Sequence, residues 1–423
     1  MSTEKGTSEK GTEDILFGHG VEKGTEDILF GHGGVFLRYK KLLLRLKQNI
    51  LRPLFHPVPR QNILRPLFLI AMFSAGVFYF RAELGQLLYE RMAAQRVQQD
   101  LLASLEPGLH VAFCGTGAPL PDPSRAESCA IVVAGQRMYV IDSGSGSTVN
   151  IALMGLAPDR INGVFLTHFH SDHIADLGNL ALQRWVNGAH DSPLTVHGPR
   201  GVEQVVAGFN QAYSQDQIYR PAHHGEIIVP SSGGGLRAFP FDLPERVAPP
   251  ARERPIAVLS DEGVTVTAMR VDHDPAAPAV AYRFEYAGRA VVFSGDLILS
   301  RSPGFADFAS GADLLIVEGL QPRLLSVLEQ NVIARGDPNL GAIMQDVLDY
   351  HTTPEDAADV AQLANASTLI LNHIVPPLPN RLLEPAFLDD APARFDGPVR
   401  VARDGMFVSM PADSTEVTFG SWF

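Results

Sequence analysis

The segment Thr167–His173 (THFHSDH) places four side chains that commonly bind metals within six residues: His168, His170, Asp172 and His173. It follows the apolar stretch Gly163–Leu166, which has the composition of a buried strand. Residues two apart share one face of an extended backbone, whereas a turn after them can direct the Asp172–His173 pair to a second point. The pattern therefore predicts a strand that ends at a site for two cations. Imidazole and carboxylate together suit zinc, iron or manganese.

The chain around this segment, residues 107–423, is predicted to form one large domain. Short apolar runs alternate there with Gly, Pro and Asp, as in strands joined by turns. Ala279–Tyr286 and Arg289–Phe293 predict a hairpin that turns at Ala287-Gly288, and residues 354–365 predict a helix. Strands in runs with helices between them indicate a layered α/β sandwich.

The N-terminal residues 1–62 differ in character from the rest. Lys10–Gly20 (KGTEDILFGHG) recurs unchanged at Lys23–Gly33, and Gln48–Phe55 recurs at Gln61–Phe68, both with an offset of 13 residues. Solenoid repeats are longer, more numerous and more variable, so these pairs indicate recent duplication. Between Asp27 and Glu83 the chain has no acidic residue but many basic ones. We expect this segment to be disordered or to lie on a membrane surface.

An apolar run, Leu67–Phe80, follows the basic segment. Its 14 residues are fewer than the roughly 20 that span a bilayer, although the run reaches 18 when it is extended back to Ile63. With the upstream positive charge, residues 63–81 predict a signal-anchor helix, with 82–106 as a linker helix. A cleaved signal and a soluble helix are the alternatives. An anchor implies that the catalytic domain is exported, whereas a soluble helix implies a cytoplasmic protein.

Charge and cysteine content add two expectations. The net charge is −13, and an acidic body repels polyanions, which argues against a large nucleic acid as substrate. Two cysteines, Cys114 and Cys129, form neither a disulfide framework nor a zinc cage. We expect two buried free thiols on strands, with a single bridge between adjacent strands as the alternative.

The pattern T-H-x-H-x-D-H resembles the signature of the metallo-β-lactamase superfamily. Val271–His273, Phe293–Asp296 and Leu371–His373 resemble its remaining parts and come in the same order. The resemblance covers roughly residues 108–410 and implies a four-layer αββα sandwich that holds two divalent metal ions, zinc first among them. It implies that His168, His170 and His273 bind one ion. It also implies that Asp172, His173 and His373 bind the other, and that Asp296 bridges both.

Within the superfamily, the chain resembles the ribonuclease Z and class III arylsulfatase branch, through Phe113–Pro121 and His351–Ala358. This resemblance makes His351 the candidate for protonating the leaving group. Asp172 would both bind metal and orient or deprotonate the attacking water, whose pKa two cations lower to about 7. Two positions depart from the family pattern, Leu297 and Asn372, and neither is an expected ligand. The chain also lacks the long basic arm that grips tRNA in ribonuclease Z.

Four further residues have possible supporting roles. His223 and His224 are candidates for lining the substrate entrance, or else form an ordinary pair of loop histidines. Asp142 and Glu318 end predicted strands and are candidates for orienting the metal-binding side chains through hydrogen bonds.

These observations predict a hydrolase of sulfate or phosphate esters that acts on a small-molecule substrate. The alternatives are a tRNA 3′-end endonuclease of the ribonuclease Z type, a lactonase and a catalytically silent metal-binding scaffold. Membrane contact is expected through the N-terminal helix, and the sequence leaves a homodimer open.

Overall fold

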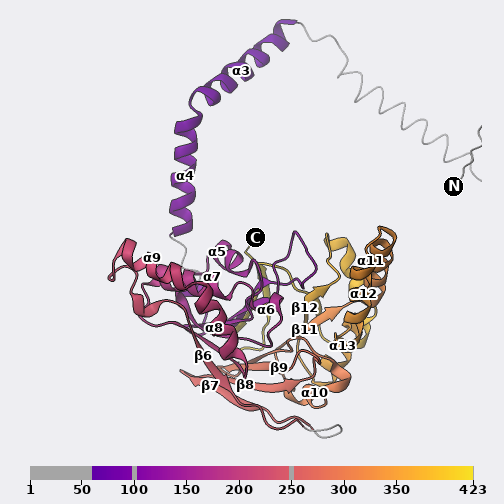
Figure 1. The fold of residues 1–423 in the computed structure, drawn as a ribbon. Helices are drawn as coiled ribbons and strands as arrows, with labels where there is room; N and C mark the ends of the chain where they lie inside the picture. The colour runs from indigo at the N-terminus through magenta and orange to yellow at the C-terminus, as the bar shows by residue number, and fades with distance from the viewer. Residues whose placement is uncertain (1–59, 98–101, 247–251, 423) are drawn as a thin grey trace, which may run out of the picture. The chain divides into compact units, whose positions relative to one another are not determined.

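The structure, a computed structural model, describes residues 60–97, 102–246 and 252–422 (Figure 1). Its contacts divide the chain into an N-terminal unit, Met1–Arg91, and a C-terminal unit, Met92–Phe423. Most of the predicted segment 1–62 lies outside the described residues, and so do both copies of the first duplicated stretch.

The N-terminal unit is helical where it is described. Helix α3 (Arg60–Tyr79) contains the apolar run, and α4 (Arg81–Val97) follows it, with a short 3-10 turn, η2 (Leu102–Ser104), further along the chain. Within the described residues, no single helix has the length and apolarity to cross a membrane. The pair Leu64–Tyr79 and Arg81–Ala94 meets that test only together, with a bend of 71° between the two helices. The predicted helix is therefore present as α3, and its role as an anchor stays a prediction.

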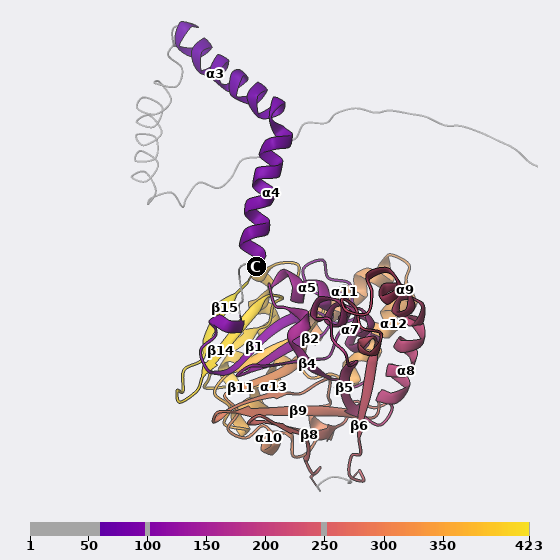
Figure 2. The same ribbon diagram turned by 90° about the vertical axis from the view of Figure 1, so that its left-hand side faces the viewer.

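Two sheets form the centre of the C-terminal unit (Figure 2). The first has eight strands in the order β15-β14-β1-β2-β3-β4-β5-β6 and the second has seven in the order β13-β12-β11-β10-β9-β8-β7. The strands of the first are β1 (Gly108–Gly115), β2 (Cys129–Ala134), β3 (Arg137–Ile141), β4 (Ile161–Phe165), β5 (Leu194–Pro199), β6 (Leu236–Phe241), β14 (Met406–Pro411) and β15 (Thr418–Ser421). Those of the second are β7 (Ile256–Asp261), β8 (Val264–Val271), β9 (Ala279–Tyr286), β10 (Arg289–Phe293), β11 (Leu314–Leu320), β12 (Leu369–Val375) and β13 (Val399–Val401).

Helices cover the outer face of each sheet. Those that pack on the first sheet are α5 (Ser147–Leu153), α7 (Leu177–Gly188) and α8 (Val202–Ala212). Those that pack on the second are α10 (Phe305–Phe308), α13 (Pro354–Leu363), α14 (Glu384–Leu388) and α15 (Ala391–Arg394). The other helices of the unit are α6 (Ser171–Ile174), α9 (Ser214–His224), α11 (Pro322–Ala334) and α12 (Pro338–Asp346).

Strand β1 shows how the sequence produces these layers. Successive side chains of a strand point to opposite faces. Leu109, Val111 and Phe113 accordingly join the core between the two sheets, whereas Ala112 and Cys114 join the core under the helices. Apolar residues at consecutive positions therefore give a strand that is buried on both sides. Together with the helix-covered second sheet, this confirms a mixed α/β sandwich with two sheets.

The predicted hairpin is confirmed at its predicted residues. Strands β9 and β10 are antiparallel, and Tyr286 pairs with Arg289 across the turn. The two turn residues, Ala287 and Gly288, have φ angles of 49° and 74°. Tight hairpins favour such positive values because they match the right-handed twist of the flanking strands.

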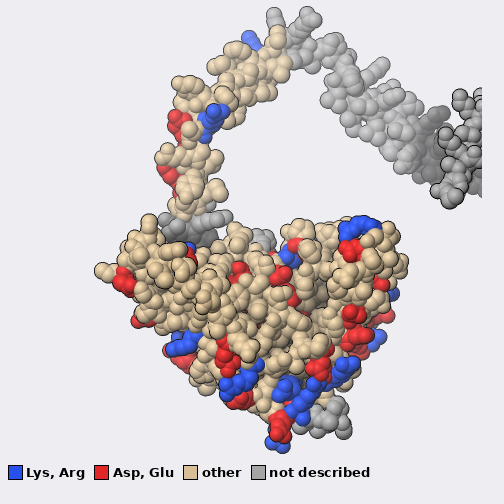
Figure 3. All heavy atoms as spheres, in the orientation of Figure 1, with Lys and Arg blue, Asp and Glu red and all other residues tan. Residues whose placement is uncertain are grey.

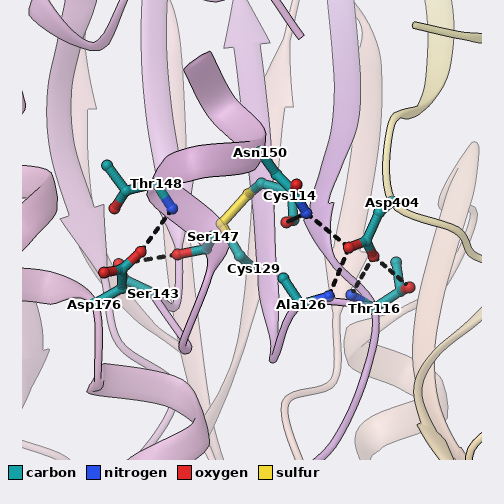
Figure 4. The surroundings of a disulfide bond; sticks show 10 residues. All are labelled: Cys114, Thr116, Ala126, Cys129, Ser143, Ser147, Thr148, Asn150, Asp176 and Asp404. Carbon is teal, nitrogen blue, oxygen red and sulfur yellow. Dashed lines mark hydrogen bonds between the residues drawn. A yellow bond between two sulfur atoms is a disulfide. The ribbon is translucent and has the colours of Figure 1, made fainter. Parts of the chain in front are cut away.

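The expectation of two free thiols is wrong. Cys114 on β1 and Cys129 on β2 form a disulfide (Figure 4). The strands are antiparallel neighbours, and a register shift pairs Cys129 with Gly115, so Cys114 lies beside Cys129. The Cα atoms are 5.0 Å apart, within the range that a disulfide spans. The alternative, a single bridge between adjacent strands, is the arrangement that the structure has.

We expect the Cys114→Ser/Cys129→Ser double variant to be less stable by about 3 kcal/mol, because the bridge closes a loop of roughly 15 residues in the unfolded chain. Chemical denaturation of the oxidised protein and the variant measures the difference. Wild-type protein treated with reductant is the control and should match the variant. Equal stability of the oxidised and reduced wild type would contradict the bridge.

Candidate metal centre

The histidine segment leaves the first sheet where β4 ends at Phe165 and enters α6 at Ser171. Asp142, directly after β3, fixes this path. Its carboxylate accepts hydrogen bonds from the backbone N–H and the hydroxyl of Thr167, each at 2.8 Å. It also accepts one from Nδ1 of His173 at 2.8 Å. Because this bond occupies Nδ1 of His173, Nε2 is the nitrogen that would bind a cation, once it has lost its proton. Asp142 therefore has the supporting position predicted for it.

The second sheet supplies three more side chains. His273 follows the end of β8, Asp296 follows the end of β10, and His373 lies within β12. His373 has a φ of 49°, and the pairing of β11 with β12 skips it, so it is a bulged residue. A bulge releases a side chain from the regular alternation of its strand. The candidate ligand atoms of Asp172 and His173 in α6 lie within 4.8 Å of that of His373, which places the histidine segment next to this bulge.

The structure brings all seven predicted side chains together in two groups. In each group the candidate ligand atoms lie within 4.8 Å of one another. The groups are His168, His170, His273 and Asp296, and Asp172, His173 and His373.

Asp296 lies between the two groups. Its Oδ2 is 3.9 Å from Nε2 of His168 and 3.8 Å from Nε2 of His273, both in the first group. The same oxygen is 3.4 Å from Nε2 of His173 and 3.4 Å from Nε2 of His373, both in the second. One carboxylate oxygen thus faces four imidazoles, two from each group.

The residues fit divalent metal ions. Nε2 of His173 and Nε2 of His273 are buried and have no hydrogen-bond partner among the residues that the structure describes. A buried nitrogen without a partner is costly, and a cation bound to its lone pair removes that cost. Six of the seven side chains are buried, and only His170 is exposed. Histidines combined with carboxylates are the ligand set of zinc, iron and manganese.

We expect zinc binding at pH 7 to release protons. Burial alone would lower the pKa of His373, but the Asp296 carboxylate raises it to about 9, so the metal-free imidazole is protonated at pH 7. The pKa of His173 is raised as well, against burial, by the same carboxylate. A ligand must lose its proton to bind, so zinc affinity should rise as the pH approaches 9. Calorimetric titration in buffers of different ionisation enthalpy counts the protons, and identical heats in all buffers would contradict this expectation.

His351 lies directly beside the two groups. Its ring centroid is 5.3 Å from that of His273 and 5.5 Å from that of His373. Its Nδ1 shares a hydrogen bond with Glu318, which also accepts one from the backbone N–H of Leu297 at 2.7 Å. Glu318 therefore orients His351. The Oε2 atom of Glu318 is 4.0 Å from Nδ1 of His373, a distance too long for a hydrogen bond.

Burial determines the protonation of this pair. It raises the pKa of Glu318 well above its usual value and lowers the pKa of His351 to about 4. Both shifts disfavour charge on either side chain, and the two groups share a proton in the bond between Glu318 and Nδ1. When Glu318 is the donor of that bond, His351 carries its own proton on Nε2 and can donate a hydrogen bond there.

A cavity of about 380 Å³ opens beside these groups. Its lining includes Asp172, His351 and His373 together with Tyr350 and apolar side chains of α12. Tyr350 and α12 are not among the residues predicted for the site, although the apolar spacing in α12 is visible in the sequence. His223 and His224 are exposed at the end of α9 and are not among the residues that line this cavity.

Comparison with known proteins identifies the family. A model of the metallo-beta-lactamase superfamily matches residues 123–353, more than half of the chain. The chain belongs to the metallo-beta-lactamase superfamily. The predicted resemblance is thereby confirmed, and this superfamily member is a metal-dependent hydrolase that acts on ester bonds.

Two curated relatives and one solved structure describe the likeness further. Ribonuclease Z of Mycobacterium bovis (strain BCG / Pasteur 1173P2) is 32% identical over 299 residues, which are 70% of this chain and 96% of that protein. Ribonuclease Z of Mycolicibacterium gilvum (strain PYR-GCK) is 33% identical over 305 residues, 70% of this chain and 94% of that protein. The metallo-beta-lactamase fold protein YhfI from Bacillus subtilis is 21% identical with a TM-score of 0.49, over 71% of this chain and 99% of that chain.

Proposed function

We propose that this superfamily member is a phosphodiesterase of the ribonuclease Z type that uses two zinc ions and cleaves at the 3′ end of tRNA precursors. The observation that carries the proposal is the 32% identity to Mycobacterium bovis ribonuclease Z over nearly the whole of that protein. From sequence alone this function is the alternative to hydrolysis of small sulfate or phosphate esters, and the acidic net charge argues against a nucleic acid substrate. The relatives support the opposite order, since they are named as ribonucleases.

Two ions are proposed because the ligands fall into two groups with Asp296 between them. We assign His168, His170 and His273 to one ion and Asp172, His173 and His373 to the other, with Asp296 shared. When bound, such ions stabilise negative charge on the ester oxygens and lower the pKa of water at the site.

The chain's own residues would move the protons of the reaction. Burial opposes ionisation of Asp172, but the charge of His173 outweighs it and lowers the pKa of the carboxyl, so Asp172 is ionised and can accept a proton from water. His351 would donate the proton on Nε2 to the leaving oxygen while the proton that it shares with Glu318 moves to Nδ1, so that the imidazole stays neutral. Glu318 also fixes the ring of His351. The two residues line the same cavity, which gives an ester access to both.

Hydrolysis of small aryl esters, with phosphate or sulfate at the centre, is the second candidate. The described residues that line the cavity include no Lys or Arg and many apolar side chains. On the face drawn in Figure 3, basic side chains are interspersed with acidic ones rather than gathered into one patch. RNA binding normally relies on such a patch. A small uncharged group matches this cavity better than a polyanion does.

Location would separate the two candidates. We propose export of the C-terminal unit, with the N-terminal helices at a membrane, only for the second candidate. The disulfide supports export, because disulfides persist in oxidising compartments. The exposed apolar side chains of α3, such as Phe68 and Phe73, support contact with lipid. An exported enzyme would not meet tRNA precursors, whereas a cytoplasmic one would.

We expect zinc-loaded protein to cleave phosphodiesters and to lose that activity with a chelator. The panel is a tRNA precursor with a 3′ trailer, bis(4-nitrophenyl) phosphate, 4-nitrophenyl sulfate and a lactone. Release of the trailer supports the first candidate, and turnover of the small phosphodiester without trailer release supports the second. Faster turnover of the sulfate or the lactone would overturn the phosphodiesterase proposal. A zinc-loaded protein that leaves every substrate intact would be a silent scaffold.

A further inference from the structure

The helical hairpin α11–α12 is built unlike the other helices of the fold. It connects β11 to the segment before α13, and its apolar side chains form a small core of their own with Ala118, Leu320 and Val375. Asp337 caps α12 by accepting a hydrogen bond from the backbone N–H of Leu340. The hairpin therefore stands on the strand ends next to the metal centre and not on a sheet face.

One face of α12 is turned toward the cavity. Leu340, Ile343, Met344 and Val347 all line it, and their spacing of three and four residues is that of a single helix face. Ile343 is 48% exposed, although it lies on the cavity side of a helix that buries other apolar residues. A large apolar side chain exposed at the wall of a cavity is typical of a binding surface.

The apolar face of α12 shares the cavity with the residue that is proposed to protonate the leaving oxygen. His351, which is placed to serve the leaving oxygen, lines the same cavity as Ile343. Tyr350 lies between them along the chain, with its ring centroid 4.8 Å from that of His351. A group attached to the leaving oxygen would therefore extend from His351 along Tyr350 to the apolar face of α12.

We infer that Tyr350 and the apolar face of α12 form a subsite for an uncharged aromatic ring carried by the leaving group. An aryl ring of a small ester and a nucleobase share this chemistry. The cavity volume of about 380 Å³ is in the range of small-ligand sites. This inference rests on the proposed phosphodiesterase function, because it names the group next to the bond that is cleaved.

Ile343→Lys tests the subsite with two phosphodiesters that differ only in the leaving phenol. The pair is methyl 4-nitrophenyl phosphate and its analogue with a 3-carboxylate on the ring. We expect the wild type to prefer the uncharged ring. A single apolar contact is worth about tenfold in kcat/KM, so Ile343→Lys should lower the rate on the uncharged ester about tenfold. It should also raise the rate on the carboxylated ester, so that the preference reverses.

Ile333→Lys is the matched control. Ile333 is 47% exposed on α11 of the same hairpin and does not line the cavity. We expect this variant to keep the wild-type preference, and both variants to keep the wild-type metal content. If Ile343→Lys changes both esters by the same factor, or behaves like Ile333→Lys, the subsite is refuted.

Two further measurements are needed. One tells whether the ring belongs to RNA or to a small ester, and the other tells failure of the proposed function from failure of the subsite. A tRNA precursor with an abasic nucleotide on the leaving-group side of the cleaved bond tests the nucleobase. A loss of cleavage that matches the aryl result, and that an abasic nucleotide on the other side does not cause, assigns the subsite to RNA. Wild type that is inactive on every phosphodiester refutes the proposed function but not the subsite. In that case calorimetric binding of 4-nitrophenol and its carboxylated analogue decides, since only Ile343→Lys should reverse their order.

Discussion

An Asp296→Ala variant is expected to lose most of its metal and nearly all of its activity. One oxygen of this carboxylate lies within 3.9 Å of Nε2 of four histidines, so its removal takes a ligand from both groups. Removing a single charge-stabilising group from an active site costs about 10²–10³-fold in rate, and a shared ligand should cost more. Metal per chain by mass spectrometry and turnover of bis(4-nitrophenyl) phosphate measure the two effects.

Two controls accompany this variant. Asp296→Asn keeps the shape of the side chain and removes its charge, so it should also lose metal. Asp359→Ala removes an Asp that pairs with Arg394 on the surface, and it should keep both metal and activity. Wild-type metal content and turnover in Asp296→Ala would end the bridging assignment.

His351→Ala is expected to keep its metal and to lose about 10²–10⁴-fold in kcat, the usual contribution of a general acid. The loss should be larger for esters with poor leaving groups, because these depend most on a proton from Nε2. A series of aryl phosphodiesters with phenols of different pKa measures this dependence. Glu318→Gln should give a smaller loss of the same kind, since Glu318 acts by orienting the ring of His351.

The metal content of His351→Ala is the decisive control. His351, Glu318, Asp296 and His373 also have candidate ligand atoms within 4.8 Å of one another. A variant that loses metal as fully as Asp296→Ala would make His351 a ligand and not an acid. His224→Ala changes an exposed histidine away from the cavity and should behave as wild type.

The candidate ligands could be predicted from sequence because the resemblance to the superfamily names them, and most lie at or shortly after a short apolar strand. His168 and His273, for example, come two or three residues after strands of different sheets. The hairpin of β9 and β10 could be predicted to the residue because Ala287-Gly288 interrupts two apolar runs. These signals depend only on residues that are close in sequence, so reading them requires no knowledge of contacts elsewhere in the chain.

Features that depend on contacts between distant residues could not be predicted. The bridge between Cys114 and Cys129 depends on a register shift between β1 and β2, which the composition of either strand does not encode. The bulge that turns His373 inward depends on its pairing with β11. The apolar residues Ile343 and Met344 are visible in the sequence of the α11–α12 hairpin. Which face of α12 borders the cavity follows only from the packing of the hairpin against Leu320 and Val375.

Both groups of candidate ligands draw on both sheets. His168 and His170 extend from the eight-stranded sheet to meet His273 of the seven-stranded one, and Asp172 and His173 meet His373 in the same way. An ion bound to either group would therefore link the two sheets of the sandwich. A ligand that binds only the folded state stabilises it in proportion to its concentration and affinity. The durability of the native enzyme would then depend on how much metal its surroundings supply, as well as on its packing.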